Sequence, residues 1–225
     1  MIGMTIHRPD NNHLPAHIRE LSDRVRAEIG ALEPVTPSLW PRRVLHTLVS
    51  GGGATAILFS PEEGVQWVMV IGSMLFVLSE LIRALLPAAN DFAIGYLPFF
   101  KQRERHEVTG LTYGFLAVTI AVFAFDKEVV VLALIFLAVG DPVAASIGRW
   151  DPRFRVFGKS LIGTIAFALS ATLAGFLATF HPDISLGWWL IAGAAVAAIA
   201  ELLPLPIDDN VTIPLTAAGL MALLV

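Results

Sequence analysis

From Trp40 onward the sequence is a succession of apolar runs separated by short polar connections. A helix that crosses roughly 30 Å of hydrocarbon needs about 20 residues. Only 15% of the chain is charged, against about 25% in soluble domains. We therefore expect an all-α fold, a polytopic transmembrane helix bundle of about seven spans. The expected spans lie near residues 43–59, 65–86, 110–125, 128–148, 161–180, 187–204 and 210–225.

Residues 1–39 form a more polar segment ahead of a predicted transmembrane catalytic domain at residues 40–225. Apolar residues recur between Leu14 and Leu32 at steps of three and four, a pattern that predicts an amphipathic helix. Acidic residues outnumber arginines there, so anionic lipid head groups are not its predicted partner. We interpret it as a cytoplasmic helix that packs or forms a homodimer. A regulatory or partner-binding helix is the alternative.

The positive residues predict the orientation of the chain. All but one of the 15 lysines and arginines precede the first run or lie in connections on the same side of the membrane; the exception is Lys127. Cytoplasmic connections are enriched in Lys and Arg, so the N-terminus is predicted to be cytoplasmic. The polar start shows no signal-peptide pattern. We expect a protein of a prokaryotic plasma membrane, with a cytoplasmic active site and no nucleic acid partner.

Two compositional features narrow the chemistry and the packing. The sequence has no cysteine, which excludes disulfides, thiolate catalysis and Cys-ligated zinc. Small residues recur at 51–53 and 193–198, and small side chains let helices approach closely in membranes. We expect both stretches to pack tightly, and we assign none of these glycines to catalysis.

Charged and polar side chains gather at the predicted cytoplasmic ends of the runs. A charge inside a span costs about 2.5 to 3.5 kcal/mol even on the gentler insertion scale, so such residues are functional candidates. They are Arg42, Arg43, His46, Glu80, Arg83, Glu107, Thr109, Asp141, Gly158, Lys159, Ser160, Glu201, Asp208, Asp209 and Asn210. Because consecutive spans alternate in direction, we expect all of these residues to share one membrane surface.

Asp141 lies in the motif Val-Gly-Asp-Pro-Val-Ala-Ala-Ser-Ile-Gly at residues 139–148. Pro142 lacks a backbone N–H and clashes with the preceding turn, so a broken helix is predicted beside this carboxylate. Non-helical backbone at membrane depth is tolerated only where it is buried in protein or lines a watery cavity. A functional carboxylate is one interpretation, and a structural kink in which Asp141 pairs with an arginine is the other.

Gly158, Lys159 and Ser160 precede the fifth run. They do not form a nucleotide P-loop, because that motif needs a glycine where Arg153 stands. A basic, glycine-hinged segment that enters a helix can bind phosphate through free N–H groups and the helix dipole. The alternative is that these positive charges only set the orientation in the membrane.

Asp208, Asp209 and Asn210 open the last run. Such oxygen ligands suit magnesium, which takes one or two carboxylates plus substrate phosphates. A polar turn between helices is the alternative.

His46 follows Arg42 by one helical turn, with Arg43 between them. The three side chains can clamp a phosphate, although a histidine at this depth can also be merely interfacial. Phosphoryl transfer needs cationic side chains, carboxylates and flexible glycine segments in one site, and the sequence places such residues at one membrane surface. Cations neutralise the phosphate charge, and a carboxylate orients or deprotonates the attacking hydroxyl.

Several motifs occur in a characteristic order. They are Arg-Arg-Val-Leu-His (42–46), Ser-Glu-Leu-Ile-Arg (79–83), Glu107 with Thr109-Gly110, Gly-Asp-Pro-Val-Ala-Ala-Ser-Ile-Gly (140–148), Gly-Lys-Ser-Leu-Ile-Gly-Thr (158–164), Ala-Glu (200–201), and Asp-Asp-Asn (208–210) with Pro214-Leu215. In order and spacing this set resembles the dolichol kinase and phytol kinase (polyprenol kinase) family of CTP-dependent membrane lipid kinases, which has diacylglycerol kinase relatives. The resemblance covers residues 40–225, with a loose fit at 87–105 and no counterpart for the N-terminal segment.

The resemblance implies transfer of the γ-phosphate of CTP to the hydroxyl of a lipid alcohol: phytol, polyprenol or dolichol, or diacylglycerol. It places nucleotide binding and catalysis on Asp141, Lys159, Asp208 and Asp209, and we extend these roles as a hypothesis. The hypothesis names Asp141, Lys159 and Glu201 as catalytic; Arg42, Arg43, His46, Gly158, Lys159, Ser160 and Asn210 as CTP-binding; Asp141, Asp208 and Asp209 as Mg²⁺ ligands; and Glu80, Arg83, Glu107 and Thr109 as substrate-binding.

Two other functions stay open at this point. A cytidylyltransferase that makes a CDP-lipid from CTP and a lipid phosphate would use the same magnesium and nucleotide groups. A transporter could also use broken helices and intramembrane acids, but its coupling acids should lie near the bilayer midplane. The sequence determines neither which lipid alcohol is the substrate nor whether CTP or ATP is the phosphate donor.

Overall fold

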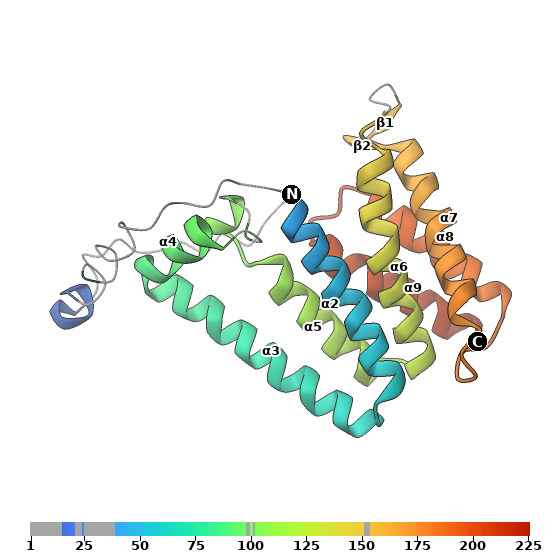
Figure 1. The fold of residues 1–225 in the computed structure, drawn as a ribbon, viewed down its shortest axis with the longest axis horizontal. Helices are drawn as coiled ribbons and strands as arrows, with labels where there is room; N and C mark the ends of the chain where they lie inside the picture. The colour runs from blue at the N-terminus through green and yellow to red at the C-terminus, as the bar shows by residue number, and fades with distance from the viewer. Residues whose placement is uncertain (1–14, 21–23, 25–38, 98–99, 101, 151–153) are drawn as a thin grey trace.

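The computed structural model describes residues 15–20, 24, 39–97, 100, 102–150 and 154–225, and this part of the chain is mainly helical (Figure 1). Most of the predicted amphipathic segment lies outside the described residues, although residues 16–20 are helical. The helices are α2 (Leu39–Phe59), α3 (Glu62–Leu85), α4 (Pro87–Tyr96), the short η2 (Gln102–Arg105), α5 (Gly110–Ala124), α6 (Lys127–Ile147), α7 (Leu161–Ala178), α8 (Trp188–Leu202) and α9 (Asp209–Leu224).

The expected apolar helices are present as α2, α3, α5, α6, α7, α8 and α9, and the all-α class is confirmed. By length and composition, α3, α6 and α7 can cross a membrane, whereas α5, α8 and α9 are shorter apolar helices. We did not predict α4, η2 or a small antiparallel hairpin. The hairpin pairs β1 (Arg155–Val156) with β2 (Lys159–Ser160) just before α7.

Helix α6 is the centre of the bundle, with α2, α7, α8 and α9 packed around it (Figure 1). Its residues from Val129 to Leu134 are at most 3% exposed, and Phe136 is fully buried. On α8, Ala194 and Ala197 are fully buried, and a Cβ built on Gly193 would lie 2.6 Å from Met221 of α9. The small residues of α8 therefore allow the close helix packing that their pattern predicted.

The expected helix break at Pro142 is wrong, because α6 continues through this proline to Ile147. A proline cannot donate to the carbonyl four residues earlier, which here belongs to Ala138. The hydroxyl of Thr47 on α2 donates to that carbonyl at 3.4 Å. A hydroxyl from a neighbouring helix thus replaces the missing backbone donor, and such replacement makes proline tolerable in membrane helices.

The expectation of tight packing at residues 51–53 is only partly correct. A Cβ built on Gly51 would lie 3.7 Å from Ala138, which is ordinary contact. A Cβ built on Gly52 or Gly53 would meet no atom within 4 Å. These two glycines therefore face open space rather than a neighbouring helix.

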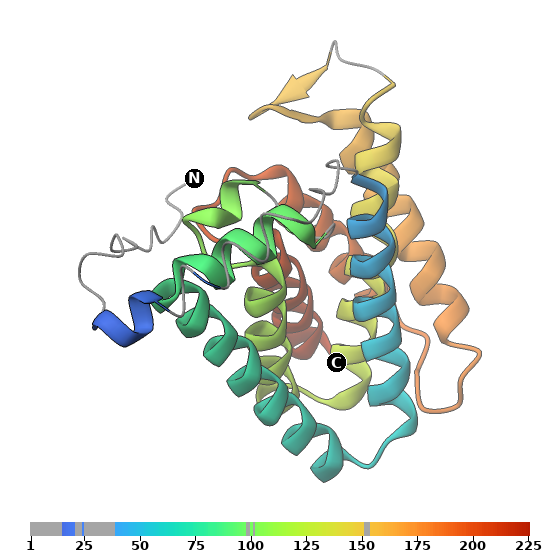
Figure 2. The ribbon, with the colours of Figure 1, turned by 60° about the vertical axis from the view of Figure 1, so that its left-hand side comes forward.

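Helix α3 stands apart from the central helices and packs mainly on α5. Helices α2 and α3 diverge from their short connection, and α5 lies between them (Figures 1 and 2). Large apolar side chains of α3 are exposed, including Trp67 at 68% and Met74 at 67%. This surface suits hydrocarbon rather than water, in agreement with a membrane protein.

Candidate active site

Lys159 is a cation that lies between two carboxylates far from it in the sequence. Its Nζ lies 3.1 Å from Asp209 Oδ2 and 3.4 Å from Glu201 Oε1, and it also donates to the backbone carbonyl of Glu201. β2 supplies the lysine, the end of α8 supplies Glu201 and the start of α9 supplies Asp209. Glu201 is only 14% exposed, and Lys159 is 28% exposed. One half-buried ammonium therefore bridges two carboxylates.

The hairpin explains how Lys159 reaches this position. Phe157 and Gly158 both have positive φ, at 52° and 81°, and connect β1 to β2. Two-residue turns with positive φ at both positions match the twist of the strands they join. Arg155 also donates to the carbonyl of Gly158 at 2.9 Å. The structure thus places Gly158 in the turn, where glycine adopts the required positive φ without steric cost.

Ser160 follows directly and caps α7, since its Oγ accepts from the backbone N–H of Gly163. Thr109 and Asp208 cap α5 and α9 in the same way. Side-chain caps satisfy N–H groups that have no partner inside the helix. The starts of these three helices are therefore fixed at the end of the bundle that carries Lys159.

His46 and Asp141 form a second pair beside this cluster. His46 Nε2 of α2 lies 3.8 Å from Asp141 Oδ2 of α6. Asp141 is close enough to Glu201 and Asp209 to interact electrostatically with both carboxylates. Among the side chains that the structure describes, His46 is thus an ionisable neighbour of Asp141.

Asp208 has different partners from its neighbour Asp209. Its Oδ1 accepts from the backbone N–H of Asn210 at 3.0 Å, and its Oδ2 lies 3.9 Å from Arg103. The amide of Asn210 donates to the carbonyl of Gly110 at 3.0 Å, which ties the start of α9 to the start of α5. The two adjacent aspartates therefore have different roles: Asp208 caps the N-terminus of α9, and Asp209 pairs with Lys159.

Within the described residues, no three His, Asp or Glu side chains lie close enough to hold a metal ion by themselves. Asp141, Asp208 and Asp209 thus do not form a closed cage. Magnesium commonly keeps several waters and binds one or two carboxylates plus substrate phosphates. The carboxylates near Lys159 fit an ion of that kind only if phosphate oxygens complete its coordination.

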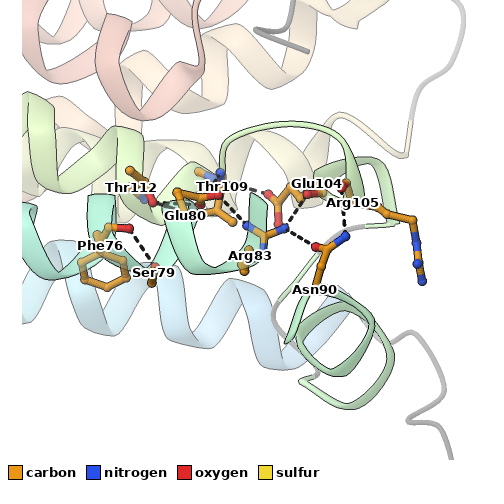
Figure 3. Close-up of polar contacts among 10 residues, drawn as sticks. Phe76, Ser79, Glu80, Arg83, Asn90, Glu104, Arg105, Thr109 and Thr112 are labelled. Atoms are coloured by element: carbon orange, nitrogen blue, oxygen red, sulfur yellow. Dashed lines mark hydrogen bonds and ion pairs between the residues drawn. The ribbon is translucent and has the colours of Figure 1, made fainter. Parts of the chain in front are cut away.

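Glu80, Arg83 and Thr109 belong to a buried network (Figure 3). Arg83 lies 2.8 Å from Glu80 and donates to the carbonyl of Glu104 at 2.5 Å. The other oxygen of Glu80 accepts from Thr109 N at 3.0 Å and from the Thr112 hydroxyl at 3.1 Å. These side chains form hydrogen bonds within the network and are at most 6% exposed. The network therefore holds the connection between α4 and α5 against α3.

The network also contains residues that the sequence analysis did not select. Asn90 of α4 accepts from Arg83 at 3.1 Å and donates to the carbonyl of Arg105 at 3.1 Å. Arg105 in turn pairs with Asp91. The available signal was the adjacent Asn90 and Asp91, which interrupt an otherwise apolar stretch.

The remaining predicted residues lie at the same end of the bundle. Glu107 is half-buried and lines a cavity of about 30 Å³ together with Arg103, Tyr113 and Asp208. Arg43 is half-buried near the start of α2. The side chain of Arg42 lies outside the described part of the structure.

Comparisons with known proteins point to lipid kinases. The chain is 27% identical over 212 residues to "CTP-dependent diacylglycerol kinase 1" of Saccharomyces cerevisiae, covering 80% of this chain and 71% of the yeast protein. It is 25% identical over 210 residues to the Schizosaccharomyces pombe protein of the same name, covering 82% and 92%. An uncharacterised protein of Methanocaldococcus jannaschii is 30% identical over 154 residues, covering 67% and 73%. No family model and no solved structure matches the chain.

Proposed function

Because the chain belongs to the family of CTP-dependent lipid kinases that its fungal relatives represent, we propose that it transfers the γ-phosphate of CTP to the hydroxyl of a lipid alcohol. Diacylglycerol is the first alcohol to test, ahead of phytol and polyprenols. The observation that carries the proposal is Lys159, held between Asp209 and Glu201 beside the pair of His46 and Asp141. This cluster lies at one end of an otherwise apolar bundle.

The proposed topology has about seven spans, a cytoplasmic N-terminus and a cytoplasmic active site, and follows the enrichment of positive residues on cytoplasmic connections. The common location of Lys159, Glu201 and Asp209 supports it, since Lys159 meets there two residues that lie 42 and 50 positions farther along the chain. The short helices α5, α8 and α9 have 15, 15 and 16 residues. A short apolar helix can cross where the bilayer thins or neighbouring helices shield its ends.

In the proposed reaction, the oxygen of the lipid hydroxyl attacks the γ-phosphorus of CTP. The new P–O bond forms as the bond from that phosphorus to the β–γ bridging oxygen breaks, and the bridging oxygen leaves with the electron pair as CDP. Asp141 accepts the hydroxyl proton, and His46, whose Nε2 lies 3.8 Å from Asp141 Oδ2, lies beside that carboxylate. Such a carboxylate can orient or deprotonate the attacking hydroxyl.

Lys159 stabilises the charge on the transferring phosphate, and Glu201 and Asp209 hold its ammonium in place. Magnesium, bound by Asp209 together with phosphate oxygens, would supply further neutralisation of the triphosphate charge. We assign Glu80, Arg83 and Thr109 to positioning rather than to contact with substrate, because their side chains are engaged in the buried network.

The test is phosphate transfer by the purified protein in mixed micelles. CTP labelled at the γ-phosphate is incubated with Mg²⁺ and a panel of alcohols: diacylglycerol, phytol and a polyprenol. We expect a labelled lipid phosphate and CDP. Release of pyrophosphate with a CDP-lipid would instead identify a cytidylyltransferase, and transfer from ATP but not from CTP would refute the nucleotide assignment.

A further inference from the structure

An apolar cavity of about 80 Å³ runs from the candidate active site into the bundle, between α2, α3, α5 and α6. At one end it is lined by His46 and Asn210, which belong to the candidate active site. Farther along, its walls are mainly apolar, formed by Phe115, Val118 and Leu137 among others. Apart from Ser50, one helical turn beyond His46, the polar side chains of the lining are thus those of His46 and Asn210.

Two parallel helix faces form the walls, since α2 and α5 both begin at the active-site end. On α2 the lining extends from His46 to Gly53, and on α5 it extends from Gly110 to Val118. Seven residues of helix correspond to a length of about 10 Å. Val49 lies on the rim and is 36% exposed, so the cavity is open at its side.

We propose that this cavity is the groove for the first part of the hydrocarbon tail of the lipid alcohol, whose hydroxyl then lies beside His46 and Asp141. The inference rests on the proposed kinase function and specifies where its substrate binds. A hydrocarbon chain is the occupant because the groove is continuous with the active site and apolar beyond its polar end. The rim also adjoins surface that suits hydrocarbon, such as Leu48, which is 65% exposed.

Glycine at position 53 keeps the groove open. A Cβ added to Gly53 would meet no atom within 4 Å, and this residue lines the cavity. A Cβ therefore has room at this lining position, about two helical turns beyond His46, and we expect a larger side chain there to narrow the groove. Gly52 is the matched control, because it has the same free space but does not line the cavity.

The test compares Gly53→Leu with Gly52→Leu on two alcohols, dioleoylglycerol and dibutyrylglycerol. The four-carbon chains of the second alcohol are shorter than the groove, so the side chain introduced by Gly53→Leu should obstruct only the first. We expect Gly53→Leu to lower kcat/KM for dioleoylglycerol by about tenfold or more. The same variant should change kcat/KM for dibutyrylglycerol by less than about twofold. Gly52→Leu should leave both values within about twofold. Equal losses on the two alcohols, or equal effects of the two variants, would overturn the inference.

A binding readout separates this inference from the proposed function. A diacylglycerol with a photoreactive diazirine in its tail is cross-linked to the protein without nucleotide, and the labelled peptides are identified by mass spectrometry. We expect labels on α2 and α5 in the wild type and in Gly52→Leu, and their loss in Gly53→Leu. Equal labelling by a phospholipid with the same tail would identify an ordinary lipid contact and refute the groove. If the wild type phosphorylates no alcohol, the kinase proposal fails while this experiment still decides the groove.

Discussion

Replacing Arg83 with methionine should destabilise the protein, because it removes one partner of a buried ion pair. Arg83 is 5% exposed at its side chain, lies 2.8 Å from Glu80 and donates to Asn90 and to the carbonyl of Glu104. Removing one member of such a pair costs about 3 to 5 kcal/mol. Glu80 keeps its hydrogen bonds from Thr109 and Thr112, so we expect the lower value, about 3 kcal/mol.

The loss should appear as a lower temperature of unfolding in detergent. In chains of about 150 to 250 residues, 1 kcal/mol corresponds to roughly 2 to 4 °C, so the expected decrease is about 6 to 12 °C. The double variant Glu80→Gln with Arg83→Met should recover part of it, since the buried carboxylate charge is then absent. Arg149→Met is the matched control, because Arg149 is exposed and an exposed substitution changes stability by about 0.5 kcal/mol or less.

Lipid kinase activity of Arg83→Met, measured below its unfolding temperature, completes this test. A positioning residue should alter activity together with stability. If Arg83→Met unfolded at the wild-type temperature and still lost its activity, Arg83 would act on substrate directly. The interpretation of the buried network as a purely positioning element would then be refuted.

Three further predictions concern the site and the central helix. Lys159→Met should lower kcat by about 10²- to 10³-fold, because it removes a preorganised cation; Lys127→Met, at the opposite end of α6, should retain activity within about twofold. Asp141→Asn should abolish phosphate transfer from CTP in membranes at normal expression, and full activity would remove Asp141 from the mechanism. Thr47→Val should lower the unfolding temperature by about 2 to 4 °C, because a buried carbonyl loses its donor at a cost of about 1 kcal/mol. An unchanged unfolding temperature would show that the Thr47 hydrogen bond contributes nothing.

The sequence predicted the helices and the end at which polar groups gather. Apolar runs require helices in hydrocarbon, because every backbone N–H and C=O must then be satisfied within the segment. Consecutive helices run in opposite directions. The end of one apolar run and the start of the next therefore lie on the same side of the bundle, and polar residues at those positions come close together. Lys159 is 42 residues from Glu201 and 50 residues from Asp209 along the chain, and the three residues still form one cluster.

The sequence did not predict which polar residues would form hydrogen bonds and ion pairs inside a buried network. Glu80 and Lys159 both lie at ends of apolar runs, and the same argument selected both. In the structure Glu80 is 6% exposed inside the buried network, whereas Lys159 is half-buried beside two carboxylates. Their difference depends on partners such as Asn90 and Glu104, which belong to a connection with little regular pattern.

Hydrophobic period and charge placement determined this protein's helical class, the approximate bounds of its helices and the location of its polar groups. Both are properties of the local sequence and of the solvent around it. Tertiary structure alone decided that Thr47 would satisfy the carbonyl freed by Pro142, and that Gly53 would line a cavity. Those outcomes depend on which helix lies beside which, and they are set by packing between segments far apart in the chain.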